Sequence, residues 1–80
     1  MFIRIQRSLA KFYKKDLILK LDNIEVEPED DKFKIKMIYN NTIYTMGEFN
    51  SFTNATKAVD YIYEQVLSGS VICTVPEDNL

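Results

Sequence analysis

The chain has 80 residues, of which 46% are hydrophobic and 28% charged, and its formal net charge is −2. This length allows one hydrophobic core, so we expect a single domain over residues 1–76 and a frayed acidic tail over 77–80. The single cysteine, Cys73, excludes an internal disulfide, and no apolar run approaches the roughly 18 residues of a membrane span or resembles a signal peptide. We therefore expect a cytoplasmic protein without a membrane anchor.

The side chains that ordinary enzymes use are scarce. The absence of histidine excludes the usual general base, the catalytic triads and most zinc sites. Gly47 and Gly69 are the only glycines, so a glycine-rich phosphate loop cannot be built. Cys73 stands in an apolar β-branched run, which is typical of a buried filler, and Asp30-Asp31 lacks the ligand spacing of a calcium loop. We expect no enzyme activity, no cofactor and no metal.

The first element is expected to be an amphipathic helix. Apolar residues recur at intervals of three and four from Phe2 to Tyr13, which favours a helix from about Gln6 to Lys15. Residues 2–5 fit a short strand equally well. Residues 1–20 carry six basic side chains against Asp16 alone, and the helical spacing places five of them on one face: Arg4, Arg7, Lys11, Lys14 and Lys15.

A period of two then predicts three antiparallel strands. The first covers residues 17–26 and changes phase after Asp22-Asn23, as a bulge or tight turn requires. A turn over Glu27–Asp31 leads to the second strand, Lys32–Tyr39, which has the clearest alternation in the chain. Asn40-Asn41 suits a two-residue hairpin, because asparagine tolerates positive φ, and Thr42–Phe49 returns as the third strand.

These turns predict a register for each hairpin. In the second, Met37 lies opposite Tyr44 and Ile35 opposite Met46 on the core face, and Ile38 faces Ile43 on the outer face. In the first, Val26 pairs with Phe33. This register places Glu25 opposite Lys34 and Glu27 opposite Lys32 on the outer face, as cross-strand ion pairs. The predicted core under the helices is Phe33, Ile35, Met37, Tyr44 and Met46.

A second helix and a further strand complete the chain. Ser51 or Thr53 can cap the helix, and Gly69 suits the left-handed residue that closes it. Its expected apolar arc is Ala55, Ala58, Val59, Ile62, Tyr63, Val66 and Leu67. The β-branched segment 71–75 indicates a last strand, whose place in a sheet stays open. The predicted fold is α+β, with two helices packed on one face of a three- to four-stranded antiparallel sheet, in the order α-β-β-β-α-(β).

The element order helix, three strands, helix resembles the double-stranded-RNA-binding domain, and residues 47–53 look like both that family and the arm-binding domain of tyrosine integrases. The RNA-binding resemblance implies phosphate contacts from the start of the second helix and from the loop between the first two strands. In this chain residues 53–57 contain one cation, Lys57, and residues 27–31 are acidic. The phosphate-contacting positions are thus neutral or repulsive, which argues against RNA binding by that route.

The acidic side of the domain is the first candidate for a binding surface. A rigid acidic surface can occupy the basic groove of a nucleic-acid enzyme, and exposed tyrosine or isoleucine side chains supply anchors. The alternative is an ordinary solvated surface. The candidate residues are Glu25, Glu27, Glu29, Asp30, Asp31, Ile38, Ile43 and Tyr61.

We therefore expect a non-enzymatic protein-binding module, such as a phage or mobile-element accessory protein that inhibits or modulates a larger host enzyme. Anti-defence inhibitors of the anti-CRISPR type are one example. A nucleic-acid-binding domain using Arg4, Arg7, Lys11, Lys14 and Lys15 is the alternative. A homodimer of unknown role, in which a second copy covers Ile38 and Ile43, also remains open.

Overall fold

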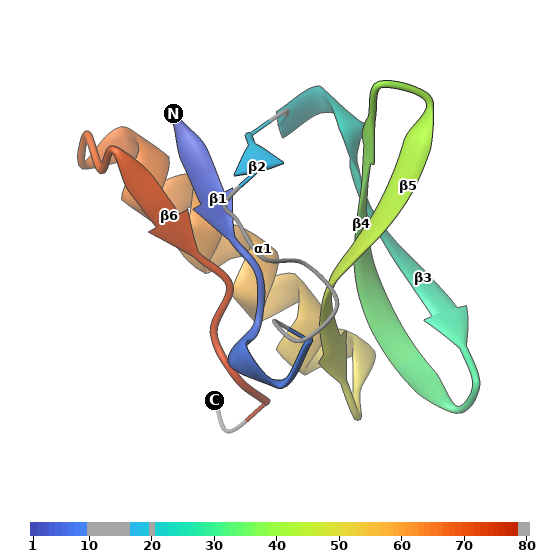
Figure 1. Ribbon diagram of the computed structural model, residues 1–80. Helices are drawn as coiled ribbons and strands as arrows, with labels where there is room; N and C mark the ends of the chain where they lie inside the picture. The colour runs from blue at the N-terminus through green and yellow to red at the C-terminus, as the bar shows by residue number, and fades with distance from the viewer. Residues whose placement is uncertain (10–16, 20, 79–80) are drawn as a thin grey trace.

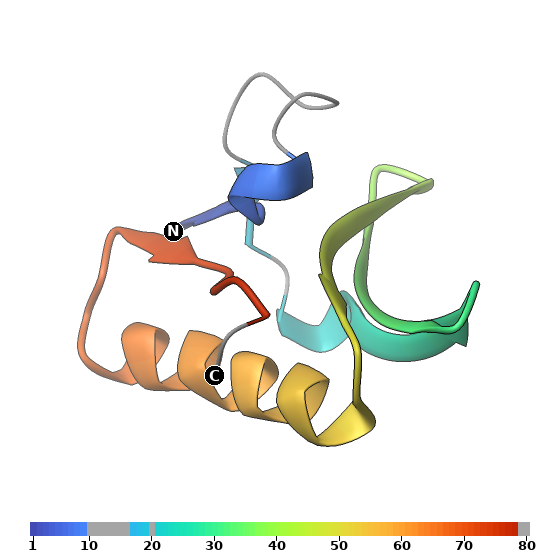
Figure 2. The same ribbon diagram turned by 90° about the horizontal axis from the view of Figure 1, so that it is seen from below.

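Two small sheets and one long helix make up the described part of the chain in the computed structural model (Figure 1), which describes residues 1–9, 17–19 and 21–78. Sheet A has the strand order β2-β1-β6, and sheet B has the order β3-β4-β5. Helix α1 runs along one side of the molecule beneath both sheets (Figure 2). The elements in chain order are β1 (Phe2–Arg4), the 3-10 turn η1 (Arg7–Leu9), β2 (Leu17–Ile18), the 3-10 turn η2 (Leu21–Asn23), β3 (Ile24–Glu29), β4 (Lys32–Tyr39), β5 (Thr42–Phe49), α1 (Phe52–Leu67) and β6 (Ile72–Thr74).

The α+β class and the antiparallel sheet are confirmed, whereas the arrangement of two helices on one sheet is wrong for the described residues. Residues 2–4 form a strand and Arg7–Leu9 a 3-10 turn, so the described part of the predicted helix at 6–15 is not α-helical. Residues 10–16 of that prediction lie outside the described residues. The spacing of Phe2, Ile3 and Ile5 fits either a helix or a strand. Residues 2–4 form a strand because they pair with β6.

Sheet A brings the two ends of the chain together. β1 lies between β2, to which it is antiparallel, and β6, to which it is parallel, with Ile3 paired to Leu17 on one side and to Cys73 on the other. All three side chains are buried against the core. The predicted last strand therefore exists and joins sheet A. Burial raises the pKa of the Cys73 thiol, which keeps this side chain in its protonated, unreactive form.

The second hairpin of sheet B follows the predicted register at its turn. Asn40 and Asn41 have φ values of 50° and 64°, Met37 lies opposite Tyr44, and Ile38 lies opposite Ile43. The predicted pairing of Ile35 with Met46 is wrong, because Ile35 pairs with Gly47 across a β-bulge. The bulge leaves Met46 without a direct partner on β4, and its side chain is still fully buried.

The first hairpin is tighter than predicted. Its turn is Asp30-Asp31, with φ values of 54° and 62°, and β3 continues through Pro28 to Glu29. β3 is an edge strand of sheet B, so the missing N–H of Pro28 costs no ladder hydrogen bond. The strand predicted over residues 17–26 is instead divided into β2, η2 and the start of β3.

The tighter turn moves the register by two residues. Val26 lies opposite Ile35 and not Phe33, Glu25 opposite Lys36, and Glu27 opposite Lys34. The predicted pairs of Glu25 with Lys34 and Glu27 with Lys32 are therefore wrong. Because the shift is even, every side chain keeps its predicted face.

Helix α1 begins and ends as its capping residues predict. The Ser51 hydroxyl accepts a hydrogen bond from the Asn54 backbone N–H at 3.1 Å, and Gly69 has a φ of 81° just past the end. Ala55, Ala58 and Ile62 are fully buried, and Val59 and Val66 pack partly against the core. Tyr63 and Leu67 are exposed, Leu67 to 86%, so the predicted apolar arc is too broad.

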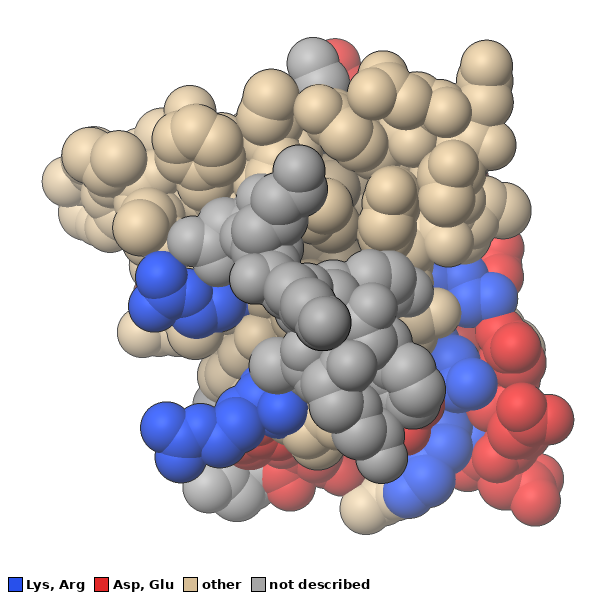
Figure 3. All heavy atoms as spheres, in the orientation of Figure 1, with Lys and Arg blue, Asp and Glu red and all other residues tan. Residues whose placement is uncertain are grey.

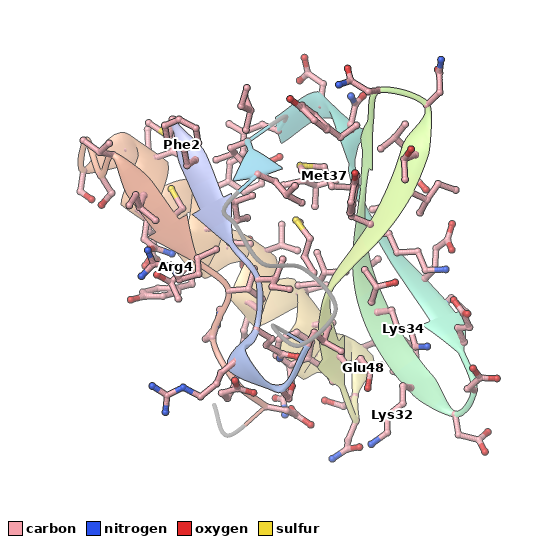
Figure 4. The ribbon with its side chains drawn as sticks, viewed as in Figure 1. Phe2, Arg4, Lys32, Lys34, Met37 and Glu48 are labelled. Atoms are coloured by element: carbon pink, nitrogen blue, oxygen red, sulfur yellow. The ribbon has the colours of Figure 1, made fainter. Side chains whose placement is uncertain are left out.

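The core lies between sheet B, sheet A and α1. Ile35, Met37 and Met46 are completely buried, as predicted, and Met37 points from β4 toward sheet A (Figure 4). Phe33 and Tyr44 are partly buried at its edge, and the Phe33 ring stacks on Phe52 at the start of α1 with a centroid distance of 6.0 Å.

A buried amide joins the two sheets. The Gln6 side chain is 1% exposed, and its Nε2 donates to the carbonyl oxygens of Glu48, at 3.2 Å, and Pro76, at 2.9 Å. Its Oε1 accepts from the Glu48 backbone N–H at 2.7 Å, and the Gln6 backbone N–H donates to the Met46 carbonyl at 2.9 Å. Gln6 therefore bonds β5, at the edge of sheet B, and links this strand to the segment that follows β6.

Gly47 allows the segment after β6 to pack closely against β5. A Cβ on residue 47 would lie 2.9 Å from Val75 Cγ1 and 3.0 Å from a Phe49 ring carbon.

The acidic end of the chain also makes contacts. Asp78 accepts from the Asn50 backbone N–H at 2.8 Å and from the Asn54 side chain at 3.0 Å, and Glu77 accepts from the Ser8 backbone N–H at 3.4 Å. Residues 79–80 of the predicted tail lie outside the described residues.

We expect the substitution Gln6→Met to lower the free energy of unfolding by about 2–4 kcal/mol, because methionine leaves buried backbone groups of Glu48 and Pro76 without partners. Urea denaturation measures the loss. The control is Gln65→Met, since Gln65 also bonds a backbone N–H and C=O, both on Thr74, but at an exposed site. Its cost should be about 1 kcal/mol or less, and an equal loss in the two variants would contradict the role of Gln6.

Candidate functional site

The outer face of sheet B carries the highest density of charge on the described surface. Strand alternation turns this face away from α1 and the core, and Figure 3 shows a column of Lys side chains bordered by Asp and Glu along that edge of the molecule. We call this surface the charged face. It consists of Glu25, Glu27, Glu29, Asp30, Lys32, Lys34, Lys36 and Glu48.

Two lysines of β4 are each shared among several carboxylates. Lys34 Nζ lies 3.8 Å from a carboxylate oxygen of Glu29, 3.7 Å from Asp30 and 3.8 Å from Glu48. Figure 4 shows Lys34 and Glu48 side by side over β4 and β5. The Lys34 side chain is only 15% exposed, so the surrounding side chains cover most of this cation.

Lys36 occupies the equivalent place one pleat further along the strand. Its Nζ lies 3.2 Å from a Glu27 carboxylate oxygen and makes a direct hydrogen-bonded ion pair with Glu29. This hydrogen bond, with the positive charges of Lys34 and Lys36, lowers the pKa of the Glu29 carboxyl group. The hydrogen bonds to Glu29 and Glu27 in turn raise the pKa of Lys36. Both side chains are therefore charged over the whole physiological pH range.

The outward charge of this region is negative. With Asp31, which is exposed in the turn, this region holds six carboxylates against three ammonium groups, and Lys32 Nζ donates at 2.7 Å to the neutral Asn50 side chain. Exposed ion pairs contribute little to stability, so the main effect of the network is on the charge that this face carries. The charged face thus presents an excess of carboxylates to solvent.

An apolar pair lies at the opposite end of the same outer face. Ile38 and Ile43 are cross-strand neighbours beside the Asn40-Asn41 turn, and they are 41% and 62% exposed. Ile38 follows Lys36 at the next outward position of β4. We call Ile38 and Ile43 the isoleucine pair. The structure therefore brings the predicted acidic residues and the two isoleucine anchors onto one surface.

Tyr61 does not belong to this surface. Its side chain is exposed, but it lies on α1, which packs against the inner face of sheet B. The predicted protein-binding set is therefore divided between two sides of the molecule, and Tyr61 is not part of the surface that the other seven residues share.

The predicted basic stripe is not the face of one helix in the described residues. Arg4 lies on the outer face of β1 and Arg7 begins η1, while Lys11, Lys14 and Lys15 lie outside the described residues. Arg4 and Arg7 nevertheless line a common pocket with Thr74 and Glu77. Sequence reasoning did not find this pocket, since it depends on pairing between β1 and β6, about 70 residues apart.

A second feature that sequence reasoning missed is an apolar row across the outer face of sheet A. Phe2 lies between Ile18 on β2 and Ile72 on β6, and all three side chains are exposed. The alternation of Phe2 and Arg4 against Ile3 and Ile5 was the available signal, because it also fits a strand.

Two features are absent from the described residues. Within residues 1–9, 17–19 and 21–78, no three Cys, Asp or Glu side chains gather in a way that could hold a metal ion. No helix in the described part of the chain is long and apolar enough to cross a membrane. Comparison of the chain with protein families, curated proteins and solved structures finds no match.

We expect Lys36→Met to raise the pKa of Glu29 toward its ordinary value, because the hydrogen bond from Lys36 is the main cause of the lowering. Carboxyl NMR titration measures this shift. A carboxyl group with a lowered folded-state pKa stabilises the protein above its unfolded pKa, and that contribution disappears as the pH falls through the folded value. The free energy of unfolding of the variant should therefore fall less steeply than that of the wild type as the pH is lowered through the acidic range. Lys57→Met, on α1, is the control, and an unchanged Glu29 pKa in Lys36→Met would contradict the network.

Proposed function

We propose that this chain is a non-enzymatic protein-binding module, and that it docks through the outer face of sheet B to inhibit or modulate a larger enzyme. An accessory protein of a phage or mobile element acting on a host enzyme, for example as an anti-defence inhibitor, would fit this description. The observation that carries the proposal is the presence, on one sheet face, of an exposed isoleucine pair and an excess of carboxylates.

The chemistry of this face defines the partner. Exposed aliphatic side chains bury apolar area on binding, and carboxylates at the rim steer a basic partner into place. Lys34 and Lys36 neutralise only part of this charge, so the excess carboxylates remain available to a basic partner. The matching surface is a basic groove with an apolar floor, as nucleic-acid enzymes have along their phosphate-binding channels.

A second candidate, nucleic-acid binding, is favoured by one observation, the common pocket of Arg4 and Arg7. It makes a different prediction, because phosphate contacts weaken steeply with salt and do not depend on the isoleucine pair. Retardation of DNA or RNA at low salt by the wild-type chain, abolished in Arg7→Gln and retained in Ile43→Asp, would replace the protein-binding proposal.

We expect Ile43→Asp to abolish capture of the partner enzyme from a cognate host lysate, because it places a charge where apolar area must be buried. Quantitative mass spectrometry of captured proteins, compared between wild type and variant, measures the loss. Since Ile43 is exposed, its substitution should lower the free energy of unfolding by only about 1 kcal/mol, from lost strand propensity and lost contact with Ile38.

The matched control is Leu67→Asp, which introduces the same change at the exposed end of α1 and should leave capture intact. The partner should also elute as salt is raised, because the carboxylate rim contributes electrostatically. A protein captured equally by wild type, Ile43→Asp and Leu67→Asp would contradict the proposal. So would recovery of a second copy of this chain alone, with a dimer mass by light scattering, and that result would favour the homodimer.

A further inference from the structure

An open pocket of about 460 Å³ lies where β1, η1 and the segment after β6 meet. Arg4, Arg7, Thr74 and Glu77 supply its polar lining, and Ile5, Val75 and Pro76 complete it, with the Ile5 and Val75 side chains almost fully buried. Arg4 lies beside β6 in Figure 4, and Figure 3 shows basic side chains at this edge of the molecule, far from the column of lysines on sheet B. The pocket is therefore distinct from the charged face.

Hydrogen bonds fix the walls of this pocket. Arg4 and Thr74 are neighbours in the parallel pairing of β1 with β6, and the Val75 backbone N–H donates to the Arg4 carbonyl at 3.0 Å. On the other side, buried Gln6 holds the Pro76 carbonyl at 2.9 Å. A pocket with walls fixed in advance loses little conformational entropy when a ligand enters.

One of the side chains that line the pocket is itself acidic. Glu77 is exposed and lines the pocket, and its side chain accepts one hydrogen bond, from the Ser8 backbone N–H at 3.4 Å. That distance is beyond the usual 2.7–3.2 Å range for an N–H···O bond. An acidic side chain held this loosely, in the lining of a pocket that also has two arginines, can be displaced by an oxyanion that binds the arginines directly.

We propose that the pocket binds a small organic anion, with its oxyanion between Arg4 and Arg7 and its apolar part against Pro76 and its neighbours Ile5 and Val75, and that Glu77 competes with this ligand. Guanidinium groups bind carboxylate and phosphate oxygens through paired N–H donors. Arg4 also interacts within the chain, and its five donors allow it to keep that interaction while binding a ligand oxygen. A carboxylate and a phosphate ester share this chemistry, and the ligands of the test distinguish them.

The test is a ¹⁵N–¹H NMR titration of the full chain with phenyl phosphate, benzoate, inorganic phosphate and benzyl alcohol. We expect saturable shifts confined to residues 4–8 and 73–77 with phenyl phosphate or benzoate, weaker binding of inorganic phosphate, and none of benzyl alcohol. The tighter of the first two ligands identifies the preferred oxyanion. Absence of a saturable response to both, or shifts spread over the molecule, would overturn the proposal.

Two variants test the roles of the charges. Arg7→Gln should weaken binding about tenfold, the loss expected for one charge-assisted hydrogen bond. Glu77→Gln should tighten it several-fold, because the amide can still accept from Ser8 but no longer competes as an anion. This gain of affinity cannot arise from misfolding.

The control for net charge is Glu64→Gln on α1, which removes one negative charge away from the pocket and should leave affinity unchanged. Equal effects of Glu77→Gln and Glu64→Gln would mean that the pocket responds only to overall charge, and would overturn the competition by Glu77. Ile43→Asp should bind the anion as wild type does, so this result is independent of the protein-binding proposal.

Discussion

The buried amide of Gln6 is the constraint on which the rest of the structure depends. Each sheet has three strands, and sheet A is built from pairings of two or three residues, which is too little for stability on its own. Gln6 bonds β5 through its backbone and side chain and reaches Pro76 after β6, so it connects both sheets with the end of the chain. Gly47 is required opposite it, since a larger residue would collide with Val75.

The buried side chains that stabilise the fold lie on the inner faces of the sheets. The outer faces can therefore differ in polarity and charge. The outer face of sheet A is apolar around Phe2 and basic around Arg4, whereas that of sheet B has carboxylates at one end and the isoleucine pair at the other. Exposed ion pairs and exposed isoleucines add little to stability. Their concentration on one face of sheet B is the feature on which the proposed protein binding depends.

Local signals were enough to predict much of sheet B and α1. The alternation in Lys32–Tyr39, the Asn40-Asn41 turn and the caps at Ser51 and Gly69 depend on neighbouring residues, and each is confirmed. The parallel pairing of β1 with β6 was not predictable, because it joins short segments about 70 residues apart with no pattern that specifies the partner. For the same reason neither the buried position of Gln6 nor the pocket beside it was predicted, since glutamine is usually a surface residue and its partners here are distant in sequence. The residues of the charged face were predicted correctly although the register of the first hairpin was wrong. Side chains alternate between the two faces of a strand, so a shift of two residues leaves the same side chains on the outer face.

That shift also creates the ion-pair network itself. In the predicted register Glu29 belongs to the four-residue loop 28–31, whereas the Asp30-Asp31 turn extends β3 and places Glu29 opposite Lys32, within reach of Lys34 and Lys36. The turn needs positive φ at two successive residues, which Asp and Asn tolerate better than most side chains. Both hairpins of sheet B use this device without glycine, so their turn residues are polar as well as conformationally suited. In the first hairpin the turn is also part of the surface, since Asp30 contacts Lys34. The backbone geometry that closes this hairpin and the charge that it presents therefore come from the same residues.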